Sequence, residues 1–419
     1  MYKNKKKETM EALIFEMRWS KLLKAYIRGK RNISGYWKNG GPVAIKQVHL
    51  PSIITEKWVL VKTEYCGICG SDMKEITLNG AHDNPLRSLI SFPQILGHEP
   101  VGIIEKIGKK VTKVKNGDRV ALNPWFPCKT RGINIECARC QIGDYIHCHN
   151  FQKGVLPIGM HLGITKGFGG FAPLISVHES QCFLIPDNVS LEKAVLADPF
   201  SVAFHSLLIL DPSESSTVLV YGLGIIGLLV IMILNKILNI KKILAIGRYQ
   251  FQKEMALKLG AKHVFMSTGE KLMEEIIDYL NLEFYKPEKG LKWTLDGVDG
   301  IIDTIASAET LEIGIRILTT QSKLVFLGVS TPKRFEHTLH YFKELEIIGS
   351  NAFSLENFKG KRAHAFEFYL EFLAANRIDP SELITHKFTL KEYKTAFDTL
   401  ADKSKSHAIK VLFSFGDTN

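Results

Sequence analysis

The stretch Thr217-Val-Leu-Val-Tyr-Gly-Leu-Gly-Ile-Ile-Gly-Leu-Leu-Val-Ile-Met-Ile-Leu234 joins a β-branched run, three spaced glycines and a long apolar run. This order predicts a buried strand, a tight turn and a buried helix. In such a turn the first glycine permits the bend, the second leaves room for a pyrophosphate, and the third lets helix and strand pack closely. The free N–H groups of the helix N-terminus then face the phosphates. The predicted dinucleotide site comprises Gly222, Leu223, Gly224, Ile225, Ile226 and Gly227; the alternative is a glycine-rich turn without a ligand.

Strand and helix patterns alternate beyond this turn. The predicted elements are helices at Ile225–Leu238 and Phe251–Leu259, and strands at Thr217–Tyr221, Lys242–Ile246, Val264-Phe265, Ile301–Thr304, Leu324–Leu327 and Leu345–Ile348. Alternating β and α units imply a parallel, doubly wound sheet. We therefore predict an α/β domain that binds a dinucleotide.

The residues at the end of the second strand of this domain indicate which nicotinamide cofactor is bound. An acidic residue commonly stands there in NAD sites, where it binds the ribose hydroxyls. Here the segment reads Ile246-Gly247-Arg248-Tyr249, so the acid is absent. A guanidinium group can bind a 2′-phosphate through two hydrogen bonds. We predict NADP, with Gly247 and Arg248 in the cofactor site; NAD and a merely exposed arginine are the alternatives.

The sequence before residue 199 contains mostly strand-like patterns. Its strand patterns lie at Trp58–Tyr65, Val101–Ile107 and Asp118–Leu122. Near the end of the chain, a helical pattern lies at Ala363–Ala375 and strand-like runs lie at 386–390 and 408–413. The predicted division is therefore a β-rich domain over 1–198, the dinucleotide domain over 199–350 and a return to the first domain over 351–419. Residues 1–9 are polar and basic, and we expect them to be disordered.

The composition of the 419 residues is that of a globular protein, with 45% hydrophobic and 23% charged residues. The formal net charge is +11, but no basic stripe interleaved with aromatic residues is present, so we expect no nucleic-acid partner. The uncharged run Thr217–Leu234 is long enough to span a membrane, yet its glycine spacing favours a buried strand and helix. We expect no membrane partner and, since no secretory leader opens the chain, a cytoplasmic location.

All of the seven cysteines except Cys182 fall in two groups. The larger group has the spacing C-x8-C-x2-C-x7-C and consists of Cys128, Cys137, Cys140 and Cys148. Four thiolates without an open position are typical of a structural zinc site. The lobe 128–148 is therefore predicted to bind zinc; buried free thiols and a nucleic-acid zinc ribbon are the alternatives.

The second group mixes thiol, imidazole and carboxylate side chains. It reads Cys66-Gly-Ile-Cys69-Gly-Ser71-Asp72, followed downstream by Gly97-His98-Glu99. Such a mixture suits a catalytic zinc with one exchangeable position. By itself the group is ambiguous, because Cys-x2-Cys is also found in redox pairs and in other zinc sites.

With these motifs the chain resembles the medium-chain zinc-dependent dehydrogenases, which include alcohol, sorbitol, threonine and glucose dehydrogenases. The resemblance rests on CGICGSD, GHE, the four-cysteine lobe, Gly169-Gly170-Phe171 and the GxGxxG turn, in that family's order. It implies a GroES-like β-rich catalytic domain and a Rossmann domain. It also implies two zinc ions per chain, a nicotinamide cofactor, a small alcohol, aldehyde or ketone substrate, and a homodimer or homotetramer.

The resemblance also implies roles for single residues. Cys69 and His98 are similar to the catalytic zinc ligands, and Glu99 to the neighbouring glutamate that can exchange onto the metal. Asp198 stands where relatives place a third ligand, usually Cys or Glu. Ser71 is similar to the hydroxyl that takes the substrate proton, and Asp72 to the carboxylate that orients the histidine.

Three features depart from the family's pattern. Lys74 replaces the histidine of the outer proton relay, Asp198 is shorter than glutamate, and the spacing between the first two lobe cysteines is longer than usual. Cys66, Cys182 and His205 are interpreted as packing residues. Two alternative functions are compatible with the sequence. One is a quinone or enoyl reductase on the same fold, and the other is a zinc- and cofactor-binding structural or regulatory protein without turnover.

Overall fold

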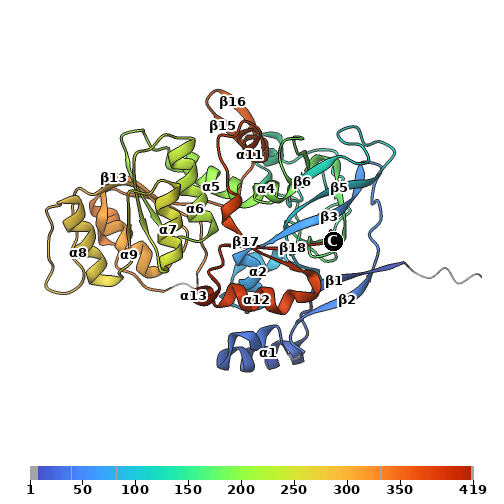
Figure 1. The fold of residues 1–419 in the computed structure, drawn as a ribbon, viewed down its shortest axis with the longest axis horizontal. Helices are drawn as coiled ribbons and strands as arrows, with labels where there is room; N and C mark the ends of the chain where they lie inside the picture. Colours follow the sequence, from blue (N-terminus) through green and yellow to red (C-terminus); the bar gives the residue numbers. More distant parts are fainter. Residues whose placement is uncertain (1–7, 39, 82, 331–332, 417–419) are drawn as a thin grey trace, which may run out of the picture. The chain divides into compact units, whose positions relative to one another are not determined.

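The computed structural model describes residues 8–416 except 39, 82, 331 and 332 (Figure 1). Its contacts divide the chain into two compact units. Unit 1 consists of Met1–Asp198, Phe366–Ala374 and Asp379–Asn419; unit 2 consists of Pro199–Ala365 and Ala375–Ile378. No helix among the described residues is long and apolar enough to cross a membrane.

Unit 2 contains a parallel six-stranded sheet in the order β11-β10-β9-β12-β13-β14. Its strands are β9 (Thr217–Tyr221), β10 (Lys242–Ile246), β11 (His263–Phe265), β12 (Val298–Asp303), β13 (Leu318–Phe326) and β14 (Glu346–Gly349). The first strand, β9, lies in the middle, and the order reverses beside it, as in doubly wound dinucleotide folds. The predicted α/β fold is therefore confirmed for this unit, because fully buried parallel strands are apolar throughout and are easy to recognise in the sequence.

Helices pack on the sheet of unit 2. They are α5 (Ala197–Leu210), α6 (Ile225–Lys236), α7 (Gln250–Leu259), α8 (Gly269–Leu280), α9 (Ala308–Ile317) and α10 (Thr338–Phe342). Helix α6 contacts β9 and β10, whereas α9 contacts β12 and β13. The core between sheet and helices includes Leu219, Ile276, Ile301, Ile313 and Leu324.

A hairpin at the end of unit 2 departs from the predicted boundary at residue 350. Strands β15 (Leu355–Phe358) and β16 (Lys361–His364) form this hairpin. Glu356 lies 2.9 Å from Nδ1 of His205 on α5, and Phe358 packs edge-on against Phe204. These contacts place residues 351–365 with unit 2, and the chain returns to unit 1 only with α11 (Ala365–Ala374).

Unit 1 is built on a seven-stranded, mostly antiparallel sheet and a three-stranded sheet, β2-β1-β4. The strands are β1 (Thr9–Phe15), β2 (Val43–His49), β3 (Trp58–Ile68), β4 (Gln94–Ile95), β5 (Glu99–Ile107), β6 (Arg119–Leu122), β7 (Leu174–His178), β8 (Cys182–Leu184), β17 (Ile384–Thr389) and β18 (Lys410–Ser414). The larger sheet runs β17-β18-β3-β5-β6-β8, with β7 also pairing β3. Strand β3 pairs with three strands, and its C-terminal end leads into the candidate site.

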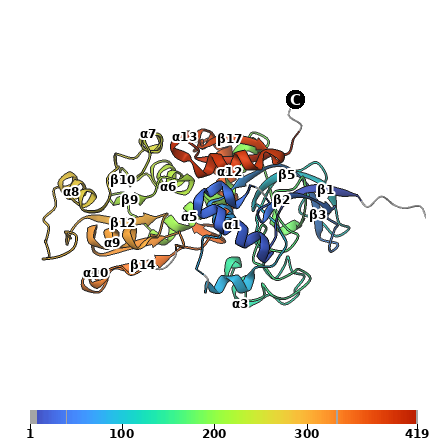
Figure 2. The ribbon, with the colours of Figure 1, turned by 90° about the horizontal axis from the view of Figure 1, so that it is seen from below.

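Short helices fill the connections of unit 1 (Figures 1 and 2). They are α1 (Trp19–Arg31), α2 (Gly70–Ile76), α3 (Ala138–Gln141), α4 (Leu191–Ala194), α12 (Tyr393–Ala401), α13 (Lys403–Ser406), and the 3-10 turns η1 (Ile33–Tyr36), η2 (Pro85–Leu89), η3 (Tyr145–His147), η4 (Glu179–Gln181), η5 (Ser381–Leu383) and η6 (Leu390–Glu392). The expected disorder of residues 1–9 is wrong at Thr9, which pairs with His49 in β1. The same expectation for residues 1–7 concerns positions outside the described residues.

Candidate active site

The turn after β3 brings a thiol, a carboxylate and an imidazole together. Cys69 is the residue before α2, and its backbone N–H donates to Oδ2 of Asp72 at 2.9 Å. Oδ1 of the same carboxylate lies 3.3 Å from Nδ1 of His98. The buried Asp72 therefore fixes both the thiol-bearing backbone and the imidazole ring, and it leaves Nε2 of His98 for another partner.

Glu99 follows His98 at the start of β5 and is buried, 2% exposed. Its Oε2 forms an ion pair with Nζ of Lys410 on β18, and Lys410 also donates to the carbonyl of Ile68 at 3.2 Å. Gly67 makes room for this pair, since a Cβ there would lie 1.9 Å from Oε2 of Glu99. The other oxygen, Oε1, is buried without a hydrogen-bond partner among the described residues.

The ligand atoms of Cys69, His98 and Glu99 all lie within 4.8 Å of one another. A thiol, an imidazole and a carboxylate with an unpartnered oxygen form a donor set that fits zinc. Asp198, at the start of α5, does not join this set among the described residues. Asp198 is buried, and it lies near the set because it and Glu99 line the same narrow gap.

Charges within the site shift the pKa of two of these groups. Burial opposes protonation of His98, but the Asp72 carboxylate outweighs burial, with help from Cys69, and raises the pKa of His98 well above its usual value. Burial raises the pKa of Asp198 to about 7; nearby His98 lowers it and Glu99 raises it. The carboxyl groups of Asp72, Glu99 and Asp198 thus gather where positive charge is favoured, as the raised pKa of His98 shows, and such a place suits a bound cation.

The remaining predicted residues lie around this cluster. Ser71 is exposed on the first turn of α2, and Lys74 is exposed one turn later. Cys66 is fully buried in β3 and belongs to an apolar cluster with Phe171 and Phe413 rather than to the metal-binding set. The two cysteines of the CxxC motif therefore have different surroundings, although they are only three residues apart in sequence.

Three site residues were not predicted from the sequence. Lys410 balances Glu99, although a lone lysine inside the apolar run 408–413 was a signal available in the sequence. The ring of His161 lies 5.4 Å from that of His98, and burial lowers the pKa of His161 to about 3. Glu75 of α2 has a pKa raised to about 8 by burial and by Asp72. No motif marks His161, because only the fold brings it to the site; Glu75 lies on α2 one turn after Asp72, but nothing in its local sequence indicates that it is buried.

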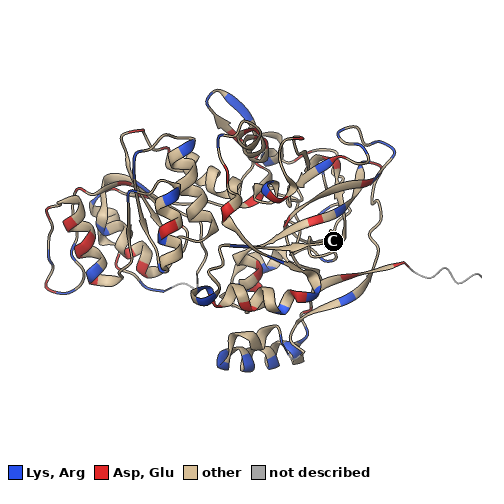
Figure 3. Ribbon diagram, viewed as in Figure 1, with Lys and Arg blue, Asp and Glu red and all other residues tan. Residues whose placement is uncertain are grey.

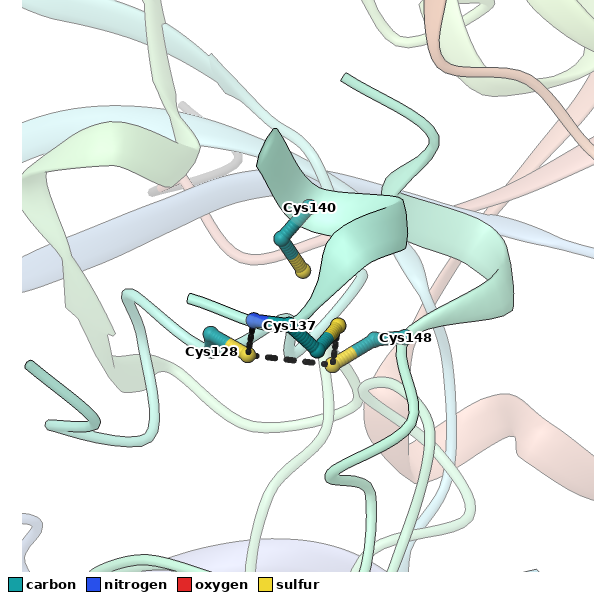
Figure 4. Close-up of side chains that lie close together, drawn as sticks. All are labelled: Cys128, Cys137, Cys140 and Cys148. Atoms are coloured by element: carbon teal, nitrogen blue, oxygen red, sulfur yellow. Dashed lines mark hydrogen bonds between the residues drawn. The ribbon is translucent and has the colours of Figure 1, made fainter. Parts of the chain in front are cut away.

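The four-cysteine lobe is compact (Figure 4). The Sγ atoms of Cys128, Cys137, Cys140 and Cys148 all lie within 4.8 Å of one another, and none is in a disulfide. Backbone N–H groups of Cys137, His149 and Asn150 each point at a sulfur at 3.4 Å. Four converging sulfurs that accept backbone N–H groups fit a tetrahedral zinc site.

Arg131 explains how the longer spacing of the lobe is accommodated. Its side chain is fully buried, and its guanidinium donates to the carbonyls of Phe126, Lys153, Leu156, Pro157 and Gly159. These bonds hold the loop after Cys128 in place, so that Cys137 still reaches the other sulfurs. The unusual spacing therefore does not disrupt the cluster.

The glycine turn after β9 has the predicted shape. Gly222 has φ +94°, a backbone conformation that favours glycine. A Cβ at Gly227 would lie 1.9 Å from the carbonyl oxygen of Gly222, so helix α6 and the turn are in close contact. At Gly224, before the first residue of α6, a Cβ would meet nothing within 4 Å. Open space therefore lies at the helix N-terminus, where a phosphate group is favoured.

The second strand ends beside this turn. The N–H of Gly222 donates to the carbonyl of Ile246 at 3.0 Å, so Gly247 follows directly beside the turn. A Cβ at Gly247 would lie 2.6 Å from Cδ1 of the buried Leu223. Arg248 is exposed, with its guanidinium 5.6 Å from the ring centre of Tyr249.

Comparison with known families defines the class. The family model of the alcohol dehydrogenase GroES-like domain matches residues 55–187, and that of the zinc-binding dehydrogenases matches residues 226–374. The chain belongs to the zinc-dependent medium-chain alcohol dehydrogenases, which are NAD(P)-dependent oxidoreductases. The predicted family, fold class and enzyme class are thus confirmed. The alternative of a non-enzymatic protein is not supported.

Individual relatives are moderately similar. The chain is 30% identical over 348 residues to the probable diacetyl reductase [(R)-acetoin forming] 2 of Saccharomyces cerevisiae, with 78% of this chain and 76% of that protein covered. It is 29% identical over 360 residues to starvation-sensing protein RspB of Escherichia coli (strain K12), covering 86% and 92%. Among solved structures, 2R,3R-butanediol dehydrogenase from Bacillus subtilis has a TM-score of 0.71 at 23% identity, covering 97% of this chain and 100% of that one.

Proposed function

We propose that the chain oxidises small polyols or vicinal diols, or reduces the corresponding ketones, at the Cys69, His98 and Glu99 cluster. The convergence of these three ligands beside the exposed Ser71 carries the proposal. The substrate class is supported by the relatives' names, which include a sorbitol dehydrogenase, an (R,R)-butanediol dehydrogenase and an L-idonate 5-dehydrogenase. Bound zinc would supply a Lewis acid that favours loss of the alcohol proton, and the nicotinamide would supply the hydride acceptor.

The chain's own residues prepare this chemistry. Cys69 and His98 would hold the metal, and Asp72 keeps the imidazole oriented with Nε2 free. We assign the third position to Asp198, which lines the same gap as Glu99 although its carboxylate is outside the converging set, and the exchanging position to Glu99, whose Oε1 has no hydrogen-bond partner among the described residues. Ser71 would take the hydroxyl proton, since its side chain is exposed next to Cys69. Lys74 stands where relatives place the histidine of the outer relay, so this chain lacks that histidine.

The purified protein should contain about two zinc ions per chain, one per cluster. We expect reduction of the nicotinamide with sorbitol, 2,3-butanediol or a related polyol, and weaker turnover with simple primary alcohols. Metal analysis and a panel of alcohols with both cofactors test this directly. A protein with two zinc ions but no turnover of any alcohol or ketone would contradict the proposal.

We propose NADP as the preferred cofactor, because Arg248 follows the strand end where an acid is absent. Solved structures with the same fold hold either cofactor: one from Escherichia coli is complexed with NADH and one from Sinorhizobium meliloti is bound to NADP. The proposal therefore rests on the residues of this chain. Leu223 and the backbone of Gly224 to Gly227 would surround the diphosphate.

Arg248→Ala should weaken NADP binding by about tenfold to a hundredfold and leave NAD binding nearly unchanged, since a charge-assisted contact to the 2′-phosphate contributes about 1.5–3 kcal/mol. Fluorescence titration of both cofactors measures this. Equal losses for the two cofactors would refute the NADP assignment. Gly247→Asp is a less direct test of the cofactor preference, because the Cβ of the aspartate would press on Leu223.

We also propose a homodimer or homotetramer, a cytoplasmic location and no nucleic-acid partner. The homo-oligomer is supported by strand β14, which lies at the edge of the parallel sheet. Two exposed aromatic residues, Tyr341 and Phe342, come shortly before it in sequence. An exposed sheet edge is a common place for another chain to pair. The absence of a nucleic-acid partner is supported by the mixture of basic and acidic residues over the ribbon outside helix α1 (Figure 3).

A further inference from the structure

Helix α1 carries an apolar stripe that faces solvent. Trp19 is 85% exposed, Leu23 62% and Ile27 51%, and these residues are spaced by four, so they lie along one helix face. Tyr26, 43% exposed, borders the stripe. Single exposed apolar residues are ordinary on protein surfaces, but an aligned row on one helix is not.

The orientation of the helix is fixed from its other side. Only Leu22 and Ala25 are buried. Gly29 lies tightly against the ring of Tyr36, because an added Cβ would come within 2.2 Å of Cε2. The following segment is anchored by Trp37, which is buried and donates to Asp398 of α12 at 3.1 Å. The stripe therefore faces outward because the inner face is already occupied within unit 1.

The charge around the stripe has one sign. The sequence from Met17 to Lys38 contains no acidic residue and seven basic ones, Arg18, Lys21, Lys24, Arg28, Lys30, Arg31 and Lys38. In Figure 3, α1 accordingly shows blue segments and no red. Glu16 pairs with Lys21 and Asp398 with Lys38, both outside the helix face that carries the stripe. Lys24 and Arg31 are exposed and border the stripe on the helix surface.

This combination selects one kind of partner. A helix with aromatic and aliphatic residues on one side, cations beside them and no acid is typical of helices that lie in the interface of an anionic membrane. A second copy of the chain fits less well, since pairing two such helices would bring like charges together. Neither family model extends over α1, since they match residues 55–187 and 226–374.

We propose that α1 binds the chain reversibly to anionic lipid surfaces. Trp19, Leu23 and Ile27 enter the boundary between headgroups and acyl chains, while Lys24 and Arg31 contact the lipid phosphates. The helix lies flat on the surface and does not cross it, in agreement with the absence of a spanning helix among the described residues. The expectation of no membrane partner rested on the spanning segment alone, and this proposal departs from it.

Co-sedimentation of the full chain with vesicles tests the proposal. The chain should bind vesicles containing phosphatidylglycerol, bind pure phosphatidylcholine vesicles far more weakly, and dissociate at high salt. Lys24→Gln/Arg31→Gln should weaken binding by about thirtyfold, and Trp19→Ser/Leu23→Ser/Ile27→Ser should abolish it. Both variants should keep wild-type turnover in solution, and circular dichroism should show that they remain folded.

Matched controls distinguish the effect of the stripe from the general effects of exposed charge and exposed apolar surface. Lys106→Gln/Lys109→Gln removes two exposed cations of the same unit, and Ile135→Ser removes a residue that is 84% exposed; neither should change vesicle binding. The proposal is wrong if the wild type ignores anionic vesicles, or if the triple variant binds them equally well. It is also wrong if the stripe captures polyglutamate in preference to vesicles, which would indicate an acidic protein partner.

Discussion

Replacing Cys69 by serine should lower kcat/KM for alcohol oxidation by at least about a thousandfold, because a Lewis-acid metal contributes several kcal/mol to transition-state stabilisation. Serine is a poor zinc ligand at neutral pH, so the zinc content should fall from about two ions per chain to about one. The thermal midpoint should change little, since Cys69 lies at a partly exposed helix start rather than in the core. Steady-state kinetics, metal analysis and calorimetry on one preparation measure all three.

Cys66→Ser is the matched control for this experiment. Cys66 belongs to the same CxxC motif but is fully buried outside the metal-binding set, where its sulfur packs against Gly170. The variant should keep both zinc ions and most of the activity, with a moderate loss of stability. If Cys69→Ser kept full activity, or if Cys66→Ser lost the catalytic metal, the assignment of the catalytic ligand would be wrong.

Replacing Cys137 by serine should have the largest effect on stability, lowering the free energy of unfolding by about 4 kcal/mol or more. The four sulfurs lie in a segment with little regular structure, α3 and η3 being its only helical turns, so a bound metal would replace the packing that holds other segments. One zinc ion should be lost while the remaining folded protein keeps its intrinsic turnover at low temperature. Denaturant unfolding and metal analysis measure the two effects.

Cys182→Ser provides the comparison. Cys182 is a fully buried thiol of β8 outside both metal-binding sets, and its replacement should cost only about 1–2 kcal/mol and no zinc. Equal destabilisation by Cys137→Ser and Cys182→Ser, with two zinc ions retained in both, would show that the lobe cysteines are ordinary buried thiols.

Some elements could be predicted from the sequence because their local hydrophobic pattern matches the burial that they have in the folded protein. Strands β9 and β10 have the predicted bounds, because each is a continuous apolar run whose side chains are nearly all buried. Helix α1 was not predicted, since its first turn has no acidic residue and Arg18 is a poor N-cap. Its apolar residues also mark a face exposed to solvent rather than one turned toward the core, so periodicity gave no indication of packing.

The hairpin at 355–364 shows a different limit. A helix was expected from Ala363, but Lys361–His364 forms β16 and the helix begins at Ala365. Its position with unit 2 depends on His205 and Glu356, which are far apart in sequence. Contacts of this kind decide where a chain leaves one unit and joins the other, and they leave no local signal.

The sequence by itself determined the donor atoms and the turns. Cysteine, histidine and carboxylate side chains at these spacings identify two metal-binding groups, and three glycines after an apolar strand identify the dinucleotide turn, because both chemistries depend on residues close in sequence. Only the tertiary structure decided the electrostatic balance of the site. Lys410 reaches Glu99 because β18 pairs with β3 beside Ile68, and His161 reaches His98 through a loop without regular structure. Charge compensation acts through space over a few ångströms, so it depends on which strands are neighbours and not on which residues are adjacent in the chain.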